Sequence, residues 1–231
     1  MIFRQLFDAQ SSTYTYLLAD PGSRQVLLID PVATQVASYL QLLQELELTL
    51  VMALDTHLHA DHVTALGALR EATGCKSMMG QQSAAQCVSA TFADGDVLRL
   101  GALALEVLYT PGHTDDSYCF LVQQGGRGYL FSGDTLLIRG SGRTDFQNGS
   151  AAQQYHSLFD RLLALPDATQ VYPAHDYRGW TVSSIAEERA HTPRLQVASE
   201  AEYVALMASL HLPDPAMMDV AVSANRACGQ P

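Results

Sequence analysis

Short apolar runs, each ended by Gly, Pro, Asp or Ser, divide the first half of the chain into strands and helices. Residues Asp20-Pro21-Gly22-Ser23 form a strong turn signal, which predicts a hairpin from the first two runs. Apolar residues at helical spacing predict helices over 36–46 and 63–72. The strands predicted in this half are 13–19, 25–30, 50–54, 76–79 and 96–100.

In the second half the same pattern continues, and three helix starts can be recognised. Ser150, Ser184 and Ser199 are each followed three residues later by Glu or Gln, which is the form of a capping box. The first of these helices is expected to run to Leu165, before Pro166. The predicted strands are 102–109, 117–123, 128–132 and 171–172. Two strand sets with helices outside them predict a layered α/β sandwich, as one domain over 1–231 with a helical extension over about 181–231.

Composition and charge narrow the class of protein. With 48% hydrophobic and 16% charged residues, a chain of 231 residues can bury a sizeable core. The net charge of −11 argues against nucleic acid and anionic membranes as partners, and no apolar run approaches the roughly 20 residues of a membrane span. The four cysteines form no C-x-x-C pair, which favours free thiols in a reducing cytoplasm. With no signal peptide recognisable at the amino terminus, a soluble cytoplasmic protein is expected.

The strongest chemical signal is the stretch His57-Leu58-His59-Ala60-Asp61-His62, directly after the predicted strand 50–54. His57 and His59 are two apart in an extended segment and therefore point to the same side. Imidazole and carboxylate groups bind first-row metals. A single histidine has an ordinary explanation as a core or surface residue, but so many desolvated polar groups would be costly without a partner. The stretch therefore predicts a site for one metal ion or two.

Three later polar residues, His113, Asp134 and His175, each follow a predicted strand. Taken singly they could be a turn residue, a helix N-cap and a surface histidine. In this order after the H-x-H-x-D-H stretch, they resemble the motif set of the metallo-β-lactamase superfamily, over about residues 10–180. The resemblance implies a four-layer αβ/βα sandwich with the metal site at one edge of two sheets.

Two further stretches, 136–147 and 172–177, are similar to the persulfide dioxygenases of the ethylmalonic-encephalopathy protein type, and the similarity continues into the tail near Asn225. Ser141 departs from that pattern, since the animal members are expected to carry Cys there. True metallo-β-lactamases usually have Cys or Ser in place of Asp134. Only 56 residues follow His175, which is short for the added helical domain of glyoxalase II.

The resemblance implies one Fe(II) per chain, bound by His57, His113 and Asp134. It also implies that glutathione persulfide reacts with O₂ to give sulfite and glutathione. Two imidazoles and one carboxylate leave positions open for substrate and oxygen. The residue types by themselves leave zinc, or a second metal, open as well. Four more residues are expected to orient ligands and water at the catalytic site by hydrogen bonds: His59, Asp61, His62 and His175.

For the tripeptide part of the substrate, Arg143 is the best candidate to pair with a carboxylate. Tyr177 offers a hydroxyl beside His175 and is a further catalytic or substrate-binding candidate. Arg139 is either a third substrate-binding residue or an ordinary salt-bridge residue. Two other functions stay open: a glyoxalase II-like binuclear thioester hydrolase, and a non-enzymatic metal-buffering or sulfide-sensing protein. Family members are often dimers, so the resemblance allows a homodimer.

Overall fold

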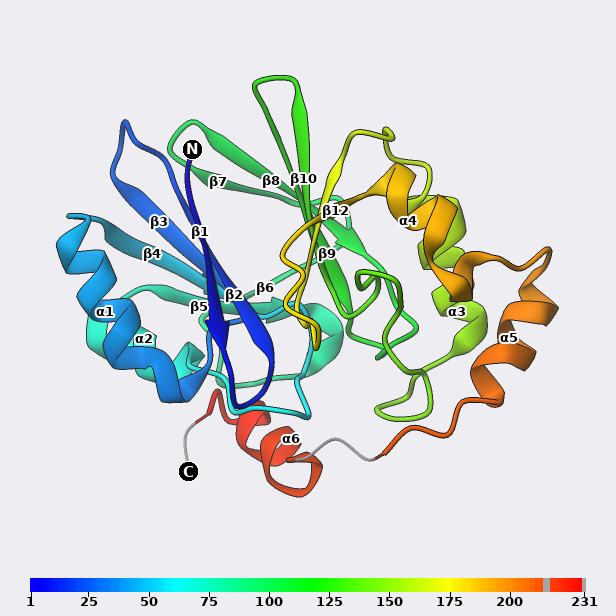
Figure 1. The fold of residues 1–231 in the computed structure, drawn as a ribbon. Helices are drawn as coiled ribbons and strands as arrows, with labels where there is room; N and C mark the ends of the chain where they lie inside the picture. Colours follow the sequence, from blue (N-terminus) through cyan, green and yellow to red (C-terminus); the bar gives the residue numbers. More distant parts are fainter. Residues whose placement is uncertain (214–216, 230–231) are drawn as a thin grey trace. The chain divides into compact units, whose positions relative to one another are not determined.

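The computed structural model describes residues 1–213 and 217–229, and the chain divides into two compact units (Figure 1). Unit 1 consists of residues 1–93, 97–104 and the carboxyl-terminal segment after residue 213. Unit 2 consists of residues 94–96 and 105–213. The prediction of a single domain stays a prediction. Residues 214–216 and 230–231 of the predicted carboxyl-terminal extension lie outside the described residues.

Unit 1 contains a six-stranded sheet in the order β1-β2-β3-β4-β5-β6. The first three strands are antiparallel neighbours, which confirms the predicted hairpin, and β3 to β6 run parallel. Strands β1 and β6 were not predicted from the sequence. The six strands are β1 (Ile2–Asp8), β2 (Thr13–Ala19), β3 (Gln25–Ile29), β4 (Thr49–Leu54), β5 (Lys76–Gly80) and β6 (Ala90–Phe92).

Helices α1 (Val36–Glu45) and α2 (Leu66–Thr73) bury apolar side chains against one face of this sheet. Tyr39 and Leu43 of α1 share a core with Leu17 and Leu28 of the strands. Helix α2 begins three residues later than predicted, and Gly74 ends it with φ 73°. That left-handed conformation favours glycine, as expected for a helix terminus. Helix α6 (Met218–Arg226) also belongs to unit 1; it lies within the predicted helical extension but was not predicted as a separate helix.

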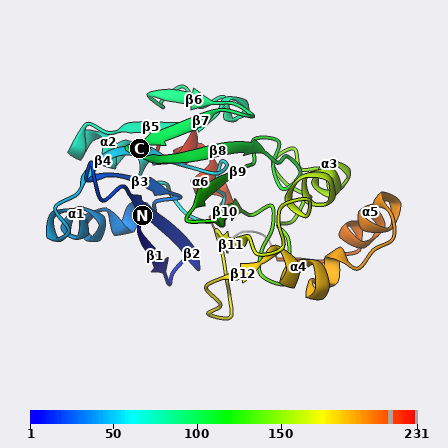
Figure 2. The same ribbon diagram turned by 90° about the horizontal axis from the view of Figure 1, so that it is seen from above.

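The second sheet has the order β12-β11-β10-β9-β8-β7, and its last strand, β7, belongs to unit 1. Neighbouring strands from β8 to β10 are antiparallel, β10 and β11 are parallel, and β12 is antiparallel to β11. The labels of Figure 2 follow these strands from a second direction. The strands are β7 (Val97–Leu100), β8 (Leu103–Tyr109), β9 (Tyr118–Gln124), β10 (Arg127–Gly133), β11 (Gln170–Pro173) and β12 (Ser183–Ser184).

The three predicted helix starts of unit 2 are confirmed. The hydroxyls of Ser150, Ser184 and Ser199 each accept a hydrogen bond from the backbone N–H three residues on. The helix from Ser150 continues as a wider π-helical turn (Ser157–Leu162), so its α-helical part is shorter than predicted. The helices are α3 (Ala151–His156), α4 (Ile185–His191) and α5 (Glu200–Ala208). The buried side chains of Leu158, Ile185 and Tyr203 pack in one hydrophobic core with side chains of the second sheet.

Strand direction places the polar segments within each unit. In unit 1, β3 and β4 are parallel, so Asp30 and the segment after Leu54 follow strand ends at the same edge. In unit 2, β8 and β10 are both antiparallel to β9, and β11 is parallel to β10. His113, Asp134 and His175 therefore follow strand ends at one edge of the second sheet.

The cysteines correct one prediction. Cys87 and Cys228, 141 residues apart, form a disulfide, so the expectation of free thiols is wrong for this pair. Sequence spacing gave no sign of it, because the fold of unit 1 brings the end of α6 to the segment after β5. Cys75 and Cys119 are buried thiols. The argument from cysteines to a cytoplasmic location is thereby weakened, and that location stays a prediction. Among the helices of the described residues, none is long and apolar enough to cross a membrane.

Candidate metal centre

The histidine loop, residues 55–65, follows β4 in unit 1 and is held by Asp30, a residue that the sequence reading did not single out. The Asp30 carboxylate is buried and accepts hydrogen bonds from the backbone N–H of Thr56 at 2.7 Å and from its hydroxyl at 3.0 Å. Burial raises the pKa of Asp30, and the nearby imidazole of His57 limits that rise. Asp30 also has φ 52°, a left-handed conformation uncommon outside glycine. Such local strain persists where surrounding contacts fix the residue.

The same contacts orient the imidazole of His57. Its Nδ1 lies 3.0 Å from the Thr56 hydroxyl oxygen, and that hydroxyl gives its one proton to Asp30. The hydroxyl oxygen can then only accept from His57, so Nδ1 carries the ring proton in the neutral imidazole. The lone pair is left on Nε2 of His57, where a metal ion could use it.

His59 and His62 follow the same rule. Nε2 of His59 lies 3.1 Å from Asp30 Oδ1, and Nδ1 of His62 lies 2.9 Å from Asp61 Oδ2. An ionised carboxylate only accepts, so each of these nitrogens donates and the opposite nitrogen keeps its lone pair. Both imidazoles are buried. In its neutral form, each of the three imidazoles of the loop thus keeps a lone pair on the nitrogen opposite its hydrogen bond.

A second row of polar residues, in contact with one another, leads to Asp61. The Asp8 carboxylate accepts from the N–H and the hydroxyl of Ser11, at 2.9 and 2.8 Å. The Ser11 hydroxyl lies 2.7 Å from that of Thr13, which donates to it because the Ser11 proton goes to Asp8; Thr13 Oγ1 also lies 3.4 Å from Asp61 Oδ2. Burial works to raise the pKa of Asp8, but hydrogen bonds from Gln35 and Ser11 outweigh it and hold that pKa below its ordinary value. The sequence pattern did not predict this row. Asp8 and Thr13 lie at strand ends and Ser11 lies in the turn between them, where polar residues are common.

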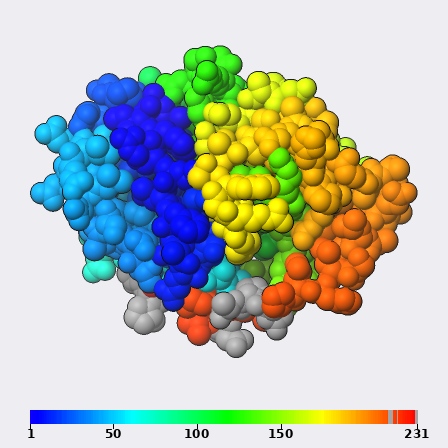
Figure 3. Space-filling model, in the orientation of Figure 1, coloured from blue at the N-terminus to red at the C-terminus, as the bar shows by residue number. Residues whose placement is uncertain are grey.

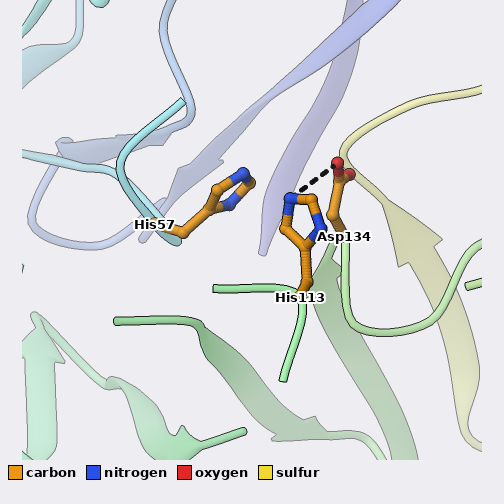
Figure 4. Close-up of side chains that lie close together, drawn as sticks. All are labelled: His57, His113 and Asp134. Atoms are coloured by element: carbon orange, nitrogen blue, oxygen red, sulfur yellow. Dashed lines mark ion pairs between the residues drawn. The ribbon is translucent and has the colours of Figure 1, made fainter. Parts of the chain in front are cut away.

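In unit 2, the side chains of His113 and Asp134 lie close together (Figure 4). Nδ1 of His113 faces the backbone carbonyl of Arg143 at 2.7 Å. A carbonyl only accepts, so Nδ1 donates and Nε2 keeps the lone pair. Nε2 is 3.5 Å from Asp134 Oδ2, and the other oxygen of Asp134 is 3.8 Å from Nε2 of His175. Asp134 therefore stands between two imidazole nitrogens.

Glycines allow the chain to approach His113 closely. A Cβ on Gly142 would lie 2.6 Å from His113 Nδ1 and would also collide with the carbonyl of Asp134. Gly112 has φ 138°, and a Cβ there would collide with Gln154. The Gln154 amide in turn donates to the carbonyl of Gly142 at 3.2 Å and accepts from the Tyr203 hydroxyl at 2.8 Å. Burial raises the pKa of Tyr203 to about 12, so its hydroxyl stays protonated.

The predicted substrate-binding arginines already have partners. The Arg143 guanidinium pairs with both oxygens of Asp145, at 2.6 and 2.8 Å, and donates to the carbonyl of Pro213 at 2.6 Å. The Arg139 guanidinium pairs with Glu187 and with the fully buried Glu188. This geometry favours the salt-bridge alternative for Arg139. Arg143 contacts the site through its backbone carbonyl, which faces His113, and its predicted role in binding a substrate carboxylate stays a prediction.

Tyr177 is different, because its side chain is 75% exposed. Its ring is stacked on His175, with centroids 6.2 Å apart and planes 8° from parallel. The segment around residues 175–185 forms part of the molecular surface (yellow in Figure 3). A cavity of about 360 Å³ lies beside it, lined by Arg139, Trp180 and Glu187 among others. Trp180, which the sequence reading passed over, is thus a second aromatic side chain near this surface.

In unit 2 the spacing of the donor atoms fits a metal ion. The 3.5 Å between His113 Nε2 and Asp134 Oδ2 is longer than a charge-assisted hydrogen bond, and it is close to the spacing of two ligands about 2.1 Å from one ion. His57 belongs to unit 1, whereas His113, Asp134 and His175 belong to unit 2.

Comparison with known proteins identifies the family. Residues 9–86 and 89–175 match the family model described as the metallo-β-lactamase superfamily. The persulfide dioxygenase ETHE1 of Mus musculus, described as mitochondrial, is 45% identical over 230 residues, covering 99% of this chain and 89% of the relative. The crystal structure of ETHE1 from Myxococcus xanthus is 54% identical, covers 100% of both chains and has a TM-score of 0.95. A hydroxyacylglutathione hydrolase of Pseudomonas entomophila is 35% identical over 193 residues, covering 84% of this chain and 72% of the relative.

These matches confirm the predicted α/β fold class of the metallo-β-lactamase type and the prediction of an enzyme. The similarity to ETHE1 extends over nearly the whole chain, whereas the family model ends at His175. The chain belongs to the metallo-β-lactamase superfamily and, within it, to the ETHE1 persulfide dioxygenase family.

Proposed function

We propose that this chain is a glutathione-persulfide dioxygenase with one Fe(II), bound by His57, His113 and Asp134. In the balanced reaction, glutathione persulfide, O₂ and water give glutathione, sulfite and two protons. The single observation that carries the proposal is the family membership, at 45% identity over 99% of the chain. The imidazole orientations support it, because His57 and His113 both keep the Nε2 lone pair available.

Iron(II) held by two imidazoles and a carboxylate would supply the electron transfer that O₂ and the sulfur need. The protein's own residues fix the orientation of the imidazole ligands. Thr56 and Asp30 fix His57, and the carbonyl of Arg143 fixes His113. With its ligands fixed in advance, the site needs little rearrangement when the metal and the substrate bind.

The remaining predicted residues have supporting roles in this proposal. His59 is paired with Asp30, and His62 is paired with Asp61; these two pairs orient the loop and nearby water. His175, buried beside Asp134, orients that carboxylate. For substrate binding, the exposed Tyr177 is the strongest candidate.

The test begins with elemental analysis of freshly purified protein, followed by an oxygen-electrode trace with glutathione persulfide on the same sample. About one iron per chain and persulfide-dependent oxygen uptake support the proposal. The variants His57→Ala, His113→Ala and Asp134→Ala should each lose iron and activity. His191→Ala is the matched control, because His191 is exposed on α4. An iron-free protein that consumes no oxygen with persulfide would exclude the proposal.

A second function, thioester hydrolysis with two metals, has its own supporting observation. His59, Asp61, His62 and His175 could serve a second ion, and a hydroxyacylglutathione hydrolase is 35% identical. It predicts two metals per chain and turnover of S-lactoylglutathione, with no oxygen uptake. The same metal analysis therefore separates the two functions.

A further inference from the structure

The side chain of Asn225 lies inside unit 1, directly against the histidine loop. Asn225 is fully buried near the end of α6. Its Nδ2 donates to the backbone carbonyls of His59, at 2.9 Å, and His62, at 2.8 Å. Its Oδ1 accepts from the backbone N–H of Thr64 at 2.8 Å. One amide thus joins three backbone groups of the loop, from more than 160 residues away in the sequence.

Backbone contacts hold the segment after Asn225 in place. The N–H of Gly67, in α2, donates to the carbonyl of Cys228 at 2.9 Å. Gly229 has φ 74°, and a Cβ there would collide with the carbonyl of Thr64. Glycine is therefore required for the tail to lie this close to the loop.

A covalent bond fixes the same segment. Cys228 is linked to Cys87, and the carbonyl of Cys87 accepts a hydrogen bond from Arg70 of α2. Arg70 also donates to Ser77 of β5, at 3.0 Å. The disulfide therefore ties the end of α6 to a segment that is hydrogen-bonded to α2, the helix directly after the histidine loop.

The contacts of Asn225 bear on the direction of the imidazoles. The two carbonyls that it binds belong to His59 and His62 themselves, and the peptide groups of a loop set where its side chains point. Without the amide, these buried carbonyls would need other donors or a different backbone path. A change in that path would turn the rings away from Asp30 and Asp61.

We propose that Asn225 is a positioning residue for the histidine loop and that the Cys87–Cys228 disulfide holds it there. The inference rests on the proposed function only in taking the loop as metal-binding. It assigns a task to the carboxyl-terminal segment, which lies beyond the end of the family-model match at residue 175.

The test uses the full chain and two readouts that do not depend on oxygen uptake. One is hydrogen–deuterium exchange of the backbone amides of residues 57–66, and the other is Fe(II) affinity in competition with a chelator. Asn225→Asp keeps the shape of the side chain but removes both donors. It should speed exchange in the loop and lower Fe(II) affinity about tenfold, the lower end of the loss typical of a residue behind the ligands, because the loop that carries His57 is then less firmly held. Asn225→Ala should act in the same direction, and it serves if the aspartate variant fails to fold.

The matched control is Asn148→Asp, which makes the same chemical change in unit 2. Asn148 Nδ2 donates to Asp115 Oδ2 in an exposed hydrogen bond, so its replacement should leave both readouts unchanged. If the Asn225 variants melt earlier but keep wild-type loop exchange and Fe(II) affinity, Asn225 only anchors the tail and the proposal is wrong.

The disulfide is tested with Asn225 intact. The double variant Cys87→Ser, Cys228→Ser should speed loop exchange and weaken Fe(II) binding in the same direction, whereas Cys75→Ser, at a buried thiol of the same unit, should not. Wild-type exchange in the double variant would remove the disulfide from the proposal. A wild-type protein that binds Fe(II) but consumes no oxygen with persulfide would exclude the proposed function and leave these comparisons valid.

Discussion

His113 donates from Nδ1 to the backbone carbonyl of Arg143, 2.7 Å away. The partner is a main-chain group, so the imidazole is held by the path of the segment 140–143 and not by the side chain of residue 143. The path of that segment is in turn set by Gly142. Its carbonyl accepts a hydrogen bond from the side-chain amide of Gln154, and its N–H donates to the backbone carbonyl of Asp134. The ligand geometry of unit 2 thus depends on a short stretch of backbone.

Replacing Gly142 with alanine should disturb both predicted ligands of unit 2. The new Cβ would meet His113 Nδ1 at 2.6 Å and the carbonyl of Asp134, so one of them must move. We expect Fe(II) affinity to fall about tenfold or more. Gly140→Ala is the control, because its Cβ would meet nothing closer than Leu137 Cβ at 3.8 Å. Equal Fe(II) affinity in the two variants would show that the close approach of Gly142 has no role.

Asp8→Asn should lower stability in a way that depends on pH. The pKa of Asp8 is below its ordinary value of 3.8 in the folded protein, so the ionised form stabilises the fold. That contribution is complete above about pH 5 and is lost as pH falls through 3.8 and then through the lower folded pKa. Urea unfolding should show the variant less stable by about 1–3 kcal/mol at pH 7.

As pH falls below 3.8 and through the lower folded pKa, the difference between Asp8→Asn and the wild type should shrink toward zero. Glu71→Gln is the control for loss of a carboxylate, since Glu71 is exposed on α2. A difference that stays constant across this pH range would mean that shape, and not charge, decides the role of Asp8.

Tyr177→Phe should affect substrate binding without affecting the metal. Its side chain is 75% exposed, so loss of the hydroxyl leaves the fold intact. If the hydroxyl binds the glutathione part of the substrate, KM should rise about threefold to tenfold with kcat unchanged, as expected for one hydrogen bond. Tyr129→Phe, elsewhere in unit 2, is the matched control. An unchanged KM would remove Tyr177 from the substrate-binding residues.

Arg139→Met should destabilise the fold and leave KM unchanged. The guanidinium is the cationic partner of Glu188, whose side chain is 0% exposed, and removal of one partner of a buried pair typically costs about 3–5 kcal/mol. Adding Glu188→Gln should restore part of the loss. Arg189→Met breaks an exposed pair with Asp167 and should cost about 1 kcal/mol or less. A raised KM with normal stability would instead support the predicted role of Arg139 in substrate binding.

The local features of the fold were predictable because their causes lie within a few residues. The caps at Ser150, Ser184 and Ser199 need a hydroxyl and an N–H three residues away, and all three are present. The apolar run before the histidine loop became β4, buried along most of its length. Strand β1 escaped prediction because it is a half-exposed edge strand with little alternation.

The residues that the sequence reading missed act over long distances. Asp30 meets Thr56 and His59 only because β3 and β4 run parallel, so that their ends lie at one edge. Asn225 reaches the loop from a helix that the periodicity did not predict. For the arginines, charge and position suggested ligand binding, but a sequence cannot show that Asp145 or Glu188 already occupies the guanidinium.

The Cys87–Cys228 bond also changes the covalent connectivity of the molecule. Residues 105–213, the main part of unit 2, lie between the two cysteines along the chain. A protease that cuts the backbone once in this stretch therefore leaves the two fragments linked. Such a nicked protein should migrate as a single species on a non-reducing gel and as two fragments after reduction.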